Sequence, residues 1–145
     1  MNHEIIARAE ELIMSKTGYI GNGMEGYCAL ALMDEDGYPS ISTLTISKAD
    51  GIKWLTFLSG LSSNKAKRIN KCNRGSVCIN SSKYSLTLVG TLDVITDPAI
   101  KREMWQEPLG AMYSGPDDPK YCVIRFTTKR YNIFFDDGAS AAGLL

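Results

Sequence analysis

The sequence predicts a mainly β protein in which six antiparallel strands, with α-helices inserted between them, form a small closed or split barrel. Short apolar runs, several with a period of two, recur along the chain, and turn signals separate them. A doubly wound parallel sheet would need a helix after nearly every strand, and the chain has too few helical stretches. The 145 residues, 44% of them hydrophobic, are enough for one domain, so residues 1–145 are predicted to form a single one.

The chain is expected to begin with a helix over residues 3–15. Apolar side chains there recur at spacings of three and four, which places them on one helical face. These positions are Ile5, Ile6, Ala9, Leu12 and Ile13. Residues 17–26 contain four glycines and are predicted to form a loop that leads into the barrel.

The barrel is predicted to span residues 27–137 and to open with a meander of three strands. The first strand, residues 27–33, is apolar, and the second, residues 38–47, alternates small polar and apolar side chains. The third strand is expected at residues 52–58. The turn sequences D-E-D-G and A-D-G connect the three strands, and such short turns make neighbouring strands antiparallel.

The rest of the barrel is predicted to contain two helices, each with a side-chain cap. A serine begins the first, which falls within residues 62–72. Asp97 caps the second, which has Pro98 in its first turn and runs to Trp105. Residues 138–145 are small and featureless and are expected to be a disordered tail. The remaining strands are predicted at residues 76–80, 85–96, 121–126 and 131–135, the last two as one strand or as a pair.

Charge and hydropathy limit the partners of the protein. Sixteen basic and sixteen acidic residues cancel, so no global positive field attracts nucleic acid. The basic residues between positions 65 and 74 mark the solvated side of a helix whose inner face needs Ala66 and Ile69, and nucleic-acid binding is not expected. No apolar run approaches the ~20 residues that span a bilayer, and the N-terminus does not resemble a signal peptide, so a cytoplasmic protein without a membrane partner is expected.

Metal sites and hydrolytic triads are not expected. The only histidine is His3, so no Ser/His or Cys/His nucleophile can be assembled around a second one. The four cysteines lack the close spacing of zinc ligands or of a disulfide scaffold, and three of them lie in apolar strand-like runs. The cysteines are Cys28, Cys72, Cys78 and Cys122. The paired carboxylates lie in turn sequences, where aspartate stabilises the turn, so no catalytic side chain is predicted.

The segment that most clearly indicates a binding function is F-L-S-G-L-S-S-N-K-A, residues 57–66. A strand ends there, a Gly/Ser loop follows, and a helix begins with Lys65 in its first turn. The N-terminus of a helix exposes unpaired N–H groups and the positive end of the helix dipole, so it attracts anions. A lysine at that end is unfavourable for the bare helix, but it is favourable beside a bound phosphate. The pattern indicates a phosphate site, and the alternative is an ordinary serine cap with a solvated lysine.

Further motifs follow this segment in a fixed order. R-G-S-V-C-I occupies residues 74–79, and V-G-T-L-D-V occupies residues 89–94. Together with residues 57–66 they resemble the pyridoxamine 5′-phosphate oxidase-like FMN-binding split barrels. Met104-Trp105 and the Y-S-G-P-D-D-P sequence from Tyr113 narrow the similarity toward the general-stress-protein branch. The resemblance covers roughly residues 4–137 and implies a six-stranded antiparallel split β-barrel of the FMN-binding type.

The resemblance also implies which residues bind the cofactor, FMN. A segment of the second strand would run beside the flavin ring and the ribityl chain, and the end of the third strand would reach the ring and the phosphate. The first turn of the following helix would bind the phosphate. The site would lie at a homodimer interface, where two aromatic residues would approach the flavin of the opposite subunit. The implied residues are, in chain order, Ser42, Thr43, Leu44, Thr45, Leu58, Ser59, Ser63, Asn64, Lys65, Ser85, Trp105 and Tyr113, the last two being the aromatic pair.

The chain departs from the oxidases at the phosphate. The oxidases have one arginine at the position of Ser42 and another at the position of Asn64, so Lys65 remains as the obvious cation and weaker FMN binding is expected. The C-terminal arginine motif that holds the vitamin substrate has no counterpart in residues 136–140. Oxidation of pyridoxamine phosphate itself is therefore not expected.

The function implied by the resemblance is that of a homodimeric, FMN-dependent oxidoreductase acting on a small-molecule redox substrate, with NAD(P)H as a candidate reductant. Two alternatives stay open. One is a flavin-binding or stress-related module without turnover, and the other is a deazaflavin- or haem-binding relative on the same scaffold. Reduction of bound flavin by NAD(P)H would indicate the enzyme, and a spectrum without flavin would indicate the last alternative.

Overall fold

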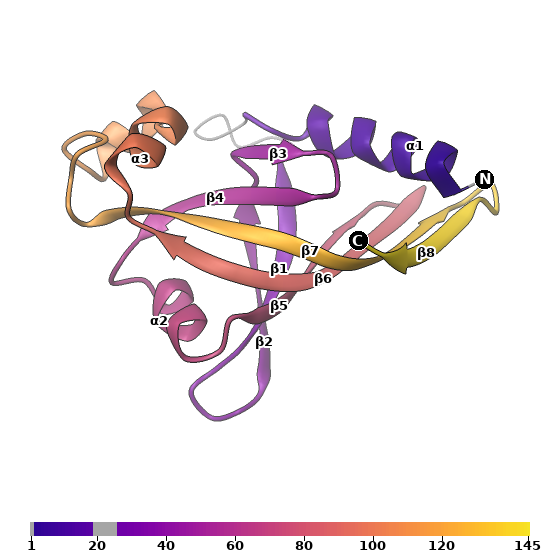
Figure 1. Ribbon diagram of the computed structural model, residues 1–145, viewed down its shortest axis with the longest axis horizontal. Coiled ribbons are helices and arrows are strands. Elements are labelled where there is room, and N and C mark those ends of the chain that lie inside the picture. The colour runs from indigo at the N-terminus through magenta and orange to yellow at the C-terminus, as the bar shows by residue number, and fades with distance from the viewer. Residues whose placement is uncertain (1, 19–25) are drawn as a thin grey trace.

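The computed structural model describes residues 2–18 and 26–145, and most of the glycine-rich loop predicted for residues 17–26 lies outside them. The described part is a curled antiparallel sheet with three α-helices around it (Figure 1). The predicted mainly β, split-barrel fold is thus confirmed. The sheet contains β1 (Tyr27–Met33), β2 (Pro39–Thr45), β3 (Lys48–Asp50), β4 (Trp54–Gly60), β5 (Arg74–Asn80), β6 (Tyr84–Ile95), β7 (Tyr121–Phe135) and β8 (Ser140–Leu144).

The sheet curls because one continuous segment joins its two ends. The strand order is β2-β1-β5-β6-β7-β4-β3, and β8 pairs with β7 off this path. Between β2 and β3 the Ile46 N–H donates to the Gly26 carbonyl at 2.9 Å, and the Ser47 N–H donates to the Thr56 carbonyl at 2.8 Å. The chain therefore passes directly from the β1 side to the β4 side, which brings the predicted second strand close to the predicted third.

Side chains of the strands alternate between the interior of the barrel and its outer face. One interior row runs across four strands through buried Leu30, Val77, Leu88 and Tyr131. Helix α1 (Asn2–Ser15) covers the side of the barrel near β3 and β8 with its buried residues Ala9 and Ile13 (Figure 1). Helix α2 (Asn64–Lys71) packs elsewhere on the barrel, against β6 and β1, and buries Ala66 and Ile69.

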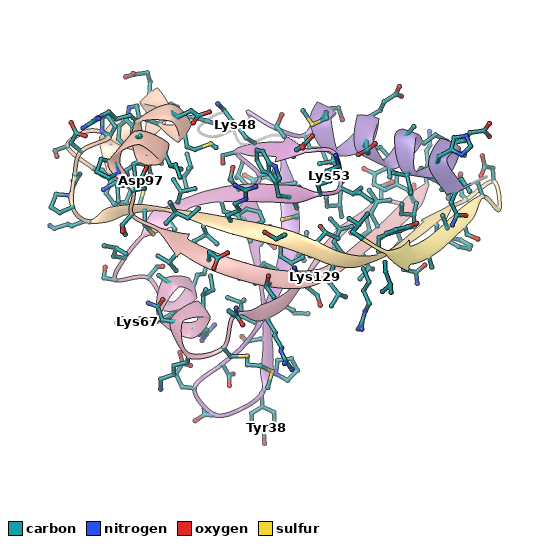
Figure 2. All side chains as sticks on the ribbon, in the orientation of Figure 1. Tyr38, Lys48, Lys53, Lys67, Asp97 and Lys129 are labelled. Atoms are coloured by element: carbon teal, nitrogen blue, oxygen red, sulfur yellow. The ribbon has the colours of Figure 1, made fainter. Side chains whose placement is uncertain are left out.

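Helix α3 (Pro98–Met104) and the 3₁₀ helix η1 (Glu107–Ala111) lie at one end of the sheet, beside the ends of β4 and β7 (Figure 1). The predicted cap of α3 is confirmed, since Asp97 Oδ2 accepts a hydrogen bond from the Ile100 N–H at 3.1 Å. Figure 2 shows Asp97 at the start of this helix. A second hydrophobic cluster, separate from the main core, forms here around buried Leu109, Tyr121 and Val123.

The predicted disordered tail is wrong. Residues 140–144 form β8, which pairs with β7, and Ala141 is buried. At Gly143 of this strand a Cβ would lie 2.8 Å from Tyr131 Oη, so a small residue suits that position. The expectation failed because the constraint lies in β7, far away in the sequence.

The strand count also differs from the six that were predicted. Besides β8, residues 48–50 form β3 against β4, so the turn comes at Gly51, whose φ is +55°, and not at residues 49–51. Glu10 of α1 fills the space beside this turn, with its carboxylate accepting from the Ile52 N–H at 3.3 Å. Residues 121–135 are one long strand and not two.

Candidate functional site

The end of β4 and the start of α2 form a short hydrogen-bonded turn. The Ser63 N–H donates to the Gly60 carbonyl at 3.0 Å, and Ser63 is the N-cap of α2. Ser63 Oγ accepts two hydrogen bonds, one from Ser59 Oγ at 3.1 Å and one from the Ala66 N–H at 3.1 Å. Because both acceptor positions of this hydroxyl are used, its own proton remains free to donate to a ligand.

Further donors lie at the same helix end. The N–H groups of Asn64 and Lys65 make no hydrogen bond within the described residues, as is usual in the first turn of a helix. The Lys65 ammonium makes no ion pair with any described carboxylate, and the first turn contains no acidic residue. A hydroxyl, two backbone N–H groups and a lysine side chain thus belong to one helix start, and a donor set of this kind can hold a phosphate group. The predicted phosphate residues Ser59, Ser63, Asn64 and Lys65 are therefore together.

Three other predicted residues meet on the outer side of β4. Leu58, Trp105 and Tyr113 all pack against the second hydrophobic cluster. The Trp105 ring meets the Tyr121 ring edge-on at 5.2 Å between centroids, and the Tyr113 ring lies 5.8 Å from Tyr121. Tyr113 Oη reaches the turn itself, since a Cβ at Gly60 would lie 2.8 Å from it. Tyr113 thus lies beside the turn between β4 and α2 of its own chain.

Burial governs the acid–base state of this cluster. Loss of water contact raises the pKa of Tyr113, and the neighbouring Cys122 and Asp118 raise it further. Burial also raises the pKa of Tyr121 to about 12 and that of Cys122 to about 11. Both phenols therefore stay protonated at neutral pH, where they can only donate or accept hydrogen bonds, and Cys122 is a thiol and not a nucleophilic thiolate.

The predicted residues of the second strand divide between two faces. Ser42 and Leu44 lie opposite Leu30 and Cys28 of β1, and these partners face the interior. Thr43 and Thr45 lie on the outer face of the sheet, as the two-residue period of a strand requires. The end of β2 approaches β4 through the Ser47–Thr56 pair, two residues before Leu58, where the hydroxyl oxygens are 2.7 Å apart.

Ser85 is not brought to the phosphate donors within one chain. It pairs with Asn80 and Phe134 at the start of β6. The chain beyond α2 meets β6 at the other end of that strand, where the Leu92 N–H donates to the Asn73 carbonyl at 2.7 Å. At ~3.3 Å per residue the two positions are roughly 20 Å apart along β6. Ser85 therefore lies at the opposite end of β6 from the chain that leaves α2.

Two residues beside the site were not singled out in the sequence. Gly60 admits Tyr113 to the turn, and Lys101 is buried next to Tyr121 although it carries a charge. The glycine had a signal, since it stands between a strand and a serine cap. Lys101 had none, because a lysine in a short polar helix is normally exposed. Among the described residues no three His, Cys, Asp or Glu side chains gather into a metal site, and none of the described helices is long and apolar enough to cross a membrane.

Replacing Ser63 with alanine is expected to lower the free energy of unfolding by about 1 kcal/mol, the usual cost of losing an N-cap side chain. The change removes the acceptor for the Ala66 N–H and for Ser59 Oγ. Urea denaturation measures it, and Ser62→Ala is the matched control, because Ser62 is exposed and caps nothing in the described structure. If the two variants were equally stable, the claim that the Ser63 side chain stabilises α2 as its N-cap would be wrong.

Solved structures share this architecture. A protein related to general stress protein 26 of B. subtilis, from Clostridium acetobutylicum, is 24% identical with a TM-score of 0.80, over 100% of this chain and 97% of its own. A pyridoxamine 5′-phosphate oxidase-related, FMN-binding protein from Nostoc punctiforme is 14% identical with a TM-score of 0.66, over 99% and 94%. A heme-binding protein from Mycobacterium smegmatis is 16% identical with a TM-score of 0.70, over 96% of this chain and 57% of its own.

In sequence, none of the curated proteins matches the chain. The family model described as pyridoxamine 5′-phosphate oxidase matches residues 24–134, which is well over half of the chain. These residues include β1 to β6, the α2 N-terminus with its phosphate donors, and most of β7. The chain therefore belongs to the pyridoxamine 5′-phosphate oxidase family.

Proposed function

We propose that the protein binds FMN and acts as a flavin-dependent oxidoreductase on a small molecule. The observation that carries the proposal is the donor set at the start of α2, where the hydroxyl of Ser63, the amides of Asn64 and Lys65 and the Lys65 ammonium fit a phosphate monoester. FMN supplies the hydride or electron chemistry when it is bound. The chain then has to hold, orient and shield the cofactor, and these tasks need no catalytic side chain, in keeping with the sequence, which predicts none.

Two observations favour FMN over haem on this scaffold. The donors at the start of α2 would hold the phosphate group at the end of FMN. The only histidine, His3, is exposed on α1, far along the chain from these donors, so it is poorly placed as an axial ligand.

The visible absorption spectrum of the purified protein, taken before and after excess FMN and desalting, tests this proposal. We expect a flavin spectrum that survives desalting, with about one FMN per chain. Anaerobic addition of NADH or NADPH then separates an oxidoreductase, whose flavin is bleached, from a binding module, whose flavin is not. A protein that retains no flavin would contradict the proposal.

The outer face of the sheet supports the expected homodimer. This face carries small side chains, among them Ala29 and Ala31 of β1, beside polar ones such as Arg130 of β7. Ile41 is 71% exposed and Leu144 is 82% exposed, although both are large and apolar. Two shallow hollows of about 380 and 360 Å³ lie beside Val89 on the same face. Apolar surface of this kind is typical of a contact between subunits, and we propose that two copies meet here. The second copy would bring Ser85, Trp105 or both toward the other flavin.

Ile41→Glu is expected to shift the protein from dimer to monomer in sedimentation velocity at micromolar concentration. The side chain is exposed within one subunit, so the fold should persist, but a dimer would bury two carboxylates against apolar surface. Met14→Glu on α1 is the control, because Met14 is also an exposed apolar residue but lies away from this face. A wild-type protein that sediments as a 15.9 kDa species would contradict the dimer.

A further inference from the structure

Lys101 is a buried cation without a counterion in the described structure. Its side chain is on α3, and the residue is only 6% exposed. The ammonium donates to the backbone carbonyl of Asp118 at 2.8 Å and lies 5.3 Å from the centre of the Tyr121 ring. No described carboxylate forms an ion pair with it. Burial of an unpaired ammonium is costly, so an apolar residue here would be the simpler way to stabilise the fold.

The Lys101 hydrogen bond attaches α3 to the loop that precedes β7. Asp118, whose carbonyl Lys101 binds, also uses its carboxylate: Oδ2 accepts from the Ser114 N–H at 2.9 Å and Oδ1 accepts from the Lys120 N–H at 2.9 Å. The Tyr121 hydroxyl donates back to the Lys101 carbonyl at 3.1 Å. These contacts tie α3 to residues 114–121, and the Leu61 N–H donates to the Lys120 carbonyl at 2.8 Å, which ties the loop to the end of β4.

Tyr113 comes directly before this loop, and its hydroxyl lies at the turn that leads into α2. The Tyr113 ring packs on Tyr121, and its Oη lies beside Gly60, in the turn that the Ser63–Gly60 hydrogen bond closes. Within the described residues this hydroxyl makes no hydrogen bond, and it is accessible to solvent. Burial raises the pKa of Tyr113, which keeps the proton on the phenol at neutral pH.

We propose that Lys101 is a positioning residue that holds the Tyr113 hydroxyl as a further donor to the FMN phosphate of the same subunit. The inference rests on the proposed function, and it assigns two residues to that site. Tyr113 supplies a donor near the turn where the arginine of the oxidases is replaced by Asn64. Lys101 acts only through the loop, where its ammonium makes a charge-assisted hydrogen bond to a backbone carbonyl.

A double-mutant cycle on FMN affinity tests the inference, with Kd measured by quenching of FMN fluorescence. Lys101→Met keeps the aliphatic stem and removes the charge, and Tyr113→Phe removes only the hydroxyl. We expect each single variant to raise Kd about tenfold, as for one hydrogen bond to a charged group. We expect the double variant to bind no more weakly than the weaker single variant, because both changes remove the same contact.

Arg102→Met is the matched control. Arg102 is the next residue of α3 and pairs with Asp117 of the same loop at 2.9 Å, but both side chains are exposed. We expect its Kd to stay within twofold of the wild type. A merely structural role for Lys101 would lower the melting temperature without any coupling to Tyr113, so the coupling is the deciding measurement.

The outcomes are distinguishable. Independent effects of Lys101→Met and Tyr113→Phe on Kd, or an unchanged Kd in either, would overturn the inference while the proposed function stands. A wild-type protein that binds no FMN would overturn both. If Lys101→Met does not fold, Asp118→Asn replaces it in the cycle, because it loosens the same loop from a more exposed position and should show the same coupling to Tyr113→Phe.

Discussion

Gly90→Ala is expected to destabilise the protein by about 3 kcal/mol or more, since large effects of this kind arise where an added atom meets groups that cannot move. Gly90 lies on β6 where the register against β7 shifts between Val89 and Gly90. A Cβ there would lie 2.0 Å from the Thr127 carbonyl oxygen and 3.1 Å from the Thr128 Cα. Both atoms belong to the backbone of a strand paired on both sides of the bulge, so the clash can be relieved only by opening the sheet.

Urea denaturation of Gly90→Ala beside Gly110→Ala measures this effect. Nothing lies within 4 Å of a Cβ at Gly110, and its backbone has no positive φ, so that control should stay within about 0.5 kcal/mol of the wild type. Both changes add one methyl group to a glycine, and they differ only in the space around it. A Gly90→Ala variant as stable as the control would mean that β6 and β7 do not approach each other as described.

The strands and helix caps could be predicted because their signals are local. Alternating apolar residues marked most strands, and an aspartate before Pro98 marked the start of α3. β8 and β3 escaped prediction for the opposite reason. Residues 140–144 carry no clear pattern of their own, and they form a strand because β7 offers an unpaired edge.

The candidate site likewise contains residues that a local sequence pattern predicts and residues that depend on long-range contacts. The phosphate donors are consecutive residues at a helix start, so their spacing in the sequence already places them together. The contact of Tyr113 with Gly60 joins residues 53 positions apart (113 − 60), and the burial of Lys101 depends on a loop that folds over α3. No local sequence pattern indicates such contacts. The distance between Ser85 and the chain that leaves α2 is likewise a property of the whole strand β6.

Lys65→Ala is expected to weaken FMN binding by about 1.5–3 kcal/mol, which is roughly a 10- to 150-fold rise in Kd. The ammonium is the cation in the first turn of α2, and the arginines that the oxidases would supply are replaced here by Ser42 and Asn64. The affinity for the phosphate therefore depends on one side chain more than it would in those enzymes. Removal of Lys65 leaves the two amides and the Ser63 hydroxyl, which act as neutral donors.

Lys67→Ala is the matched control for the Lys65→Ala measurement. Lys67 is on the same helix and carries the same charge, but it is exposed and extends outward from the barrel (Figure 2). Both variants change the net charge of the protein by one unit, so long-range attraction of the FMN dianion is altered to a similar degree in both. A rise in Kd confined to Lys65→Ala then identifies direct contact with the phosphate. Equal and small effects in the two variants would mean that the lysine is solvated and that Ser63 is an ordinary cap.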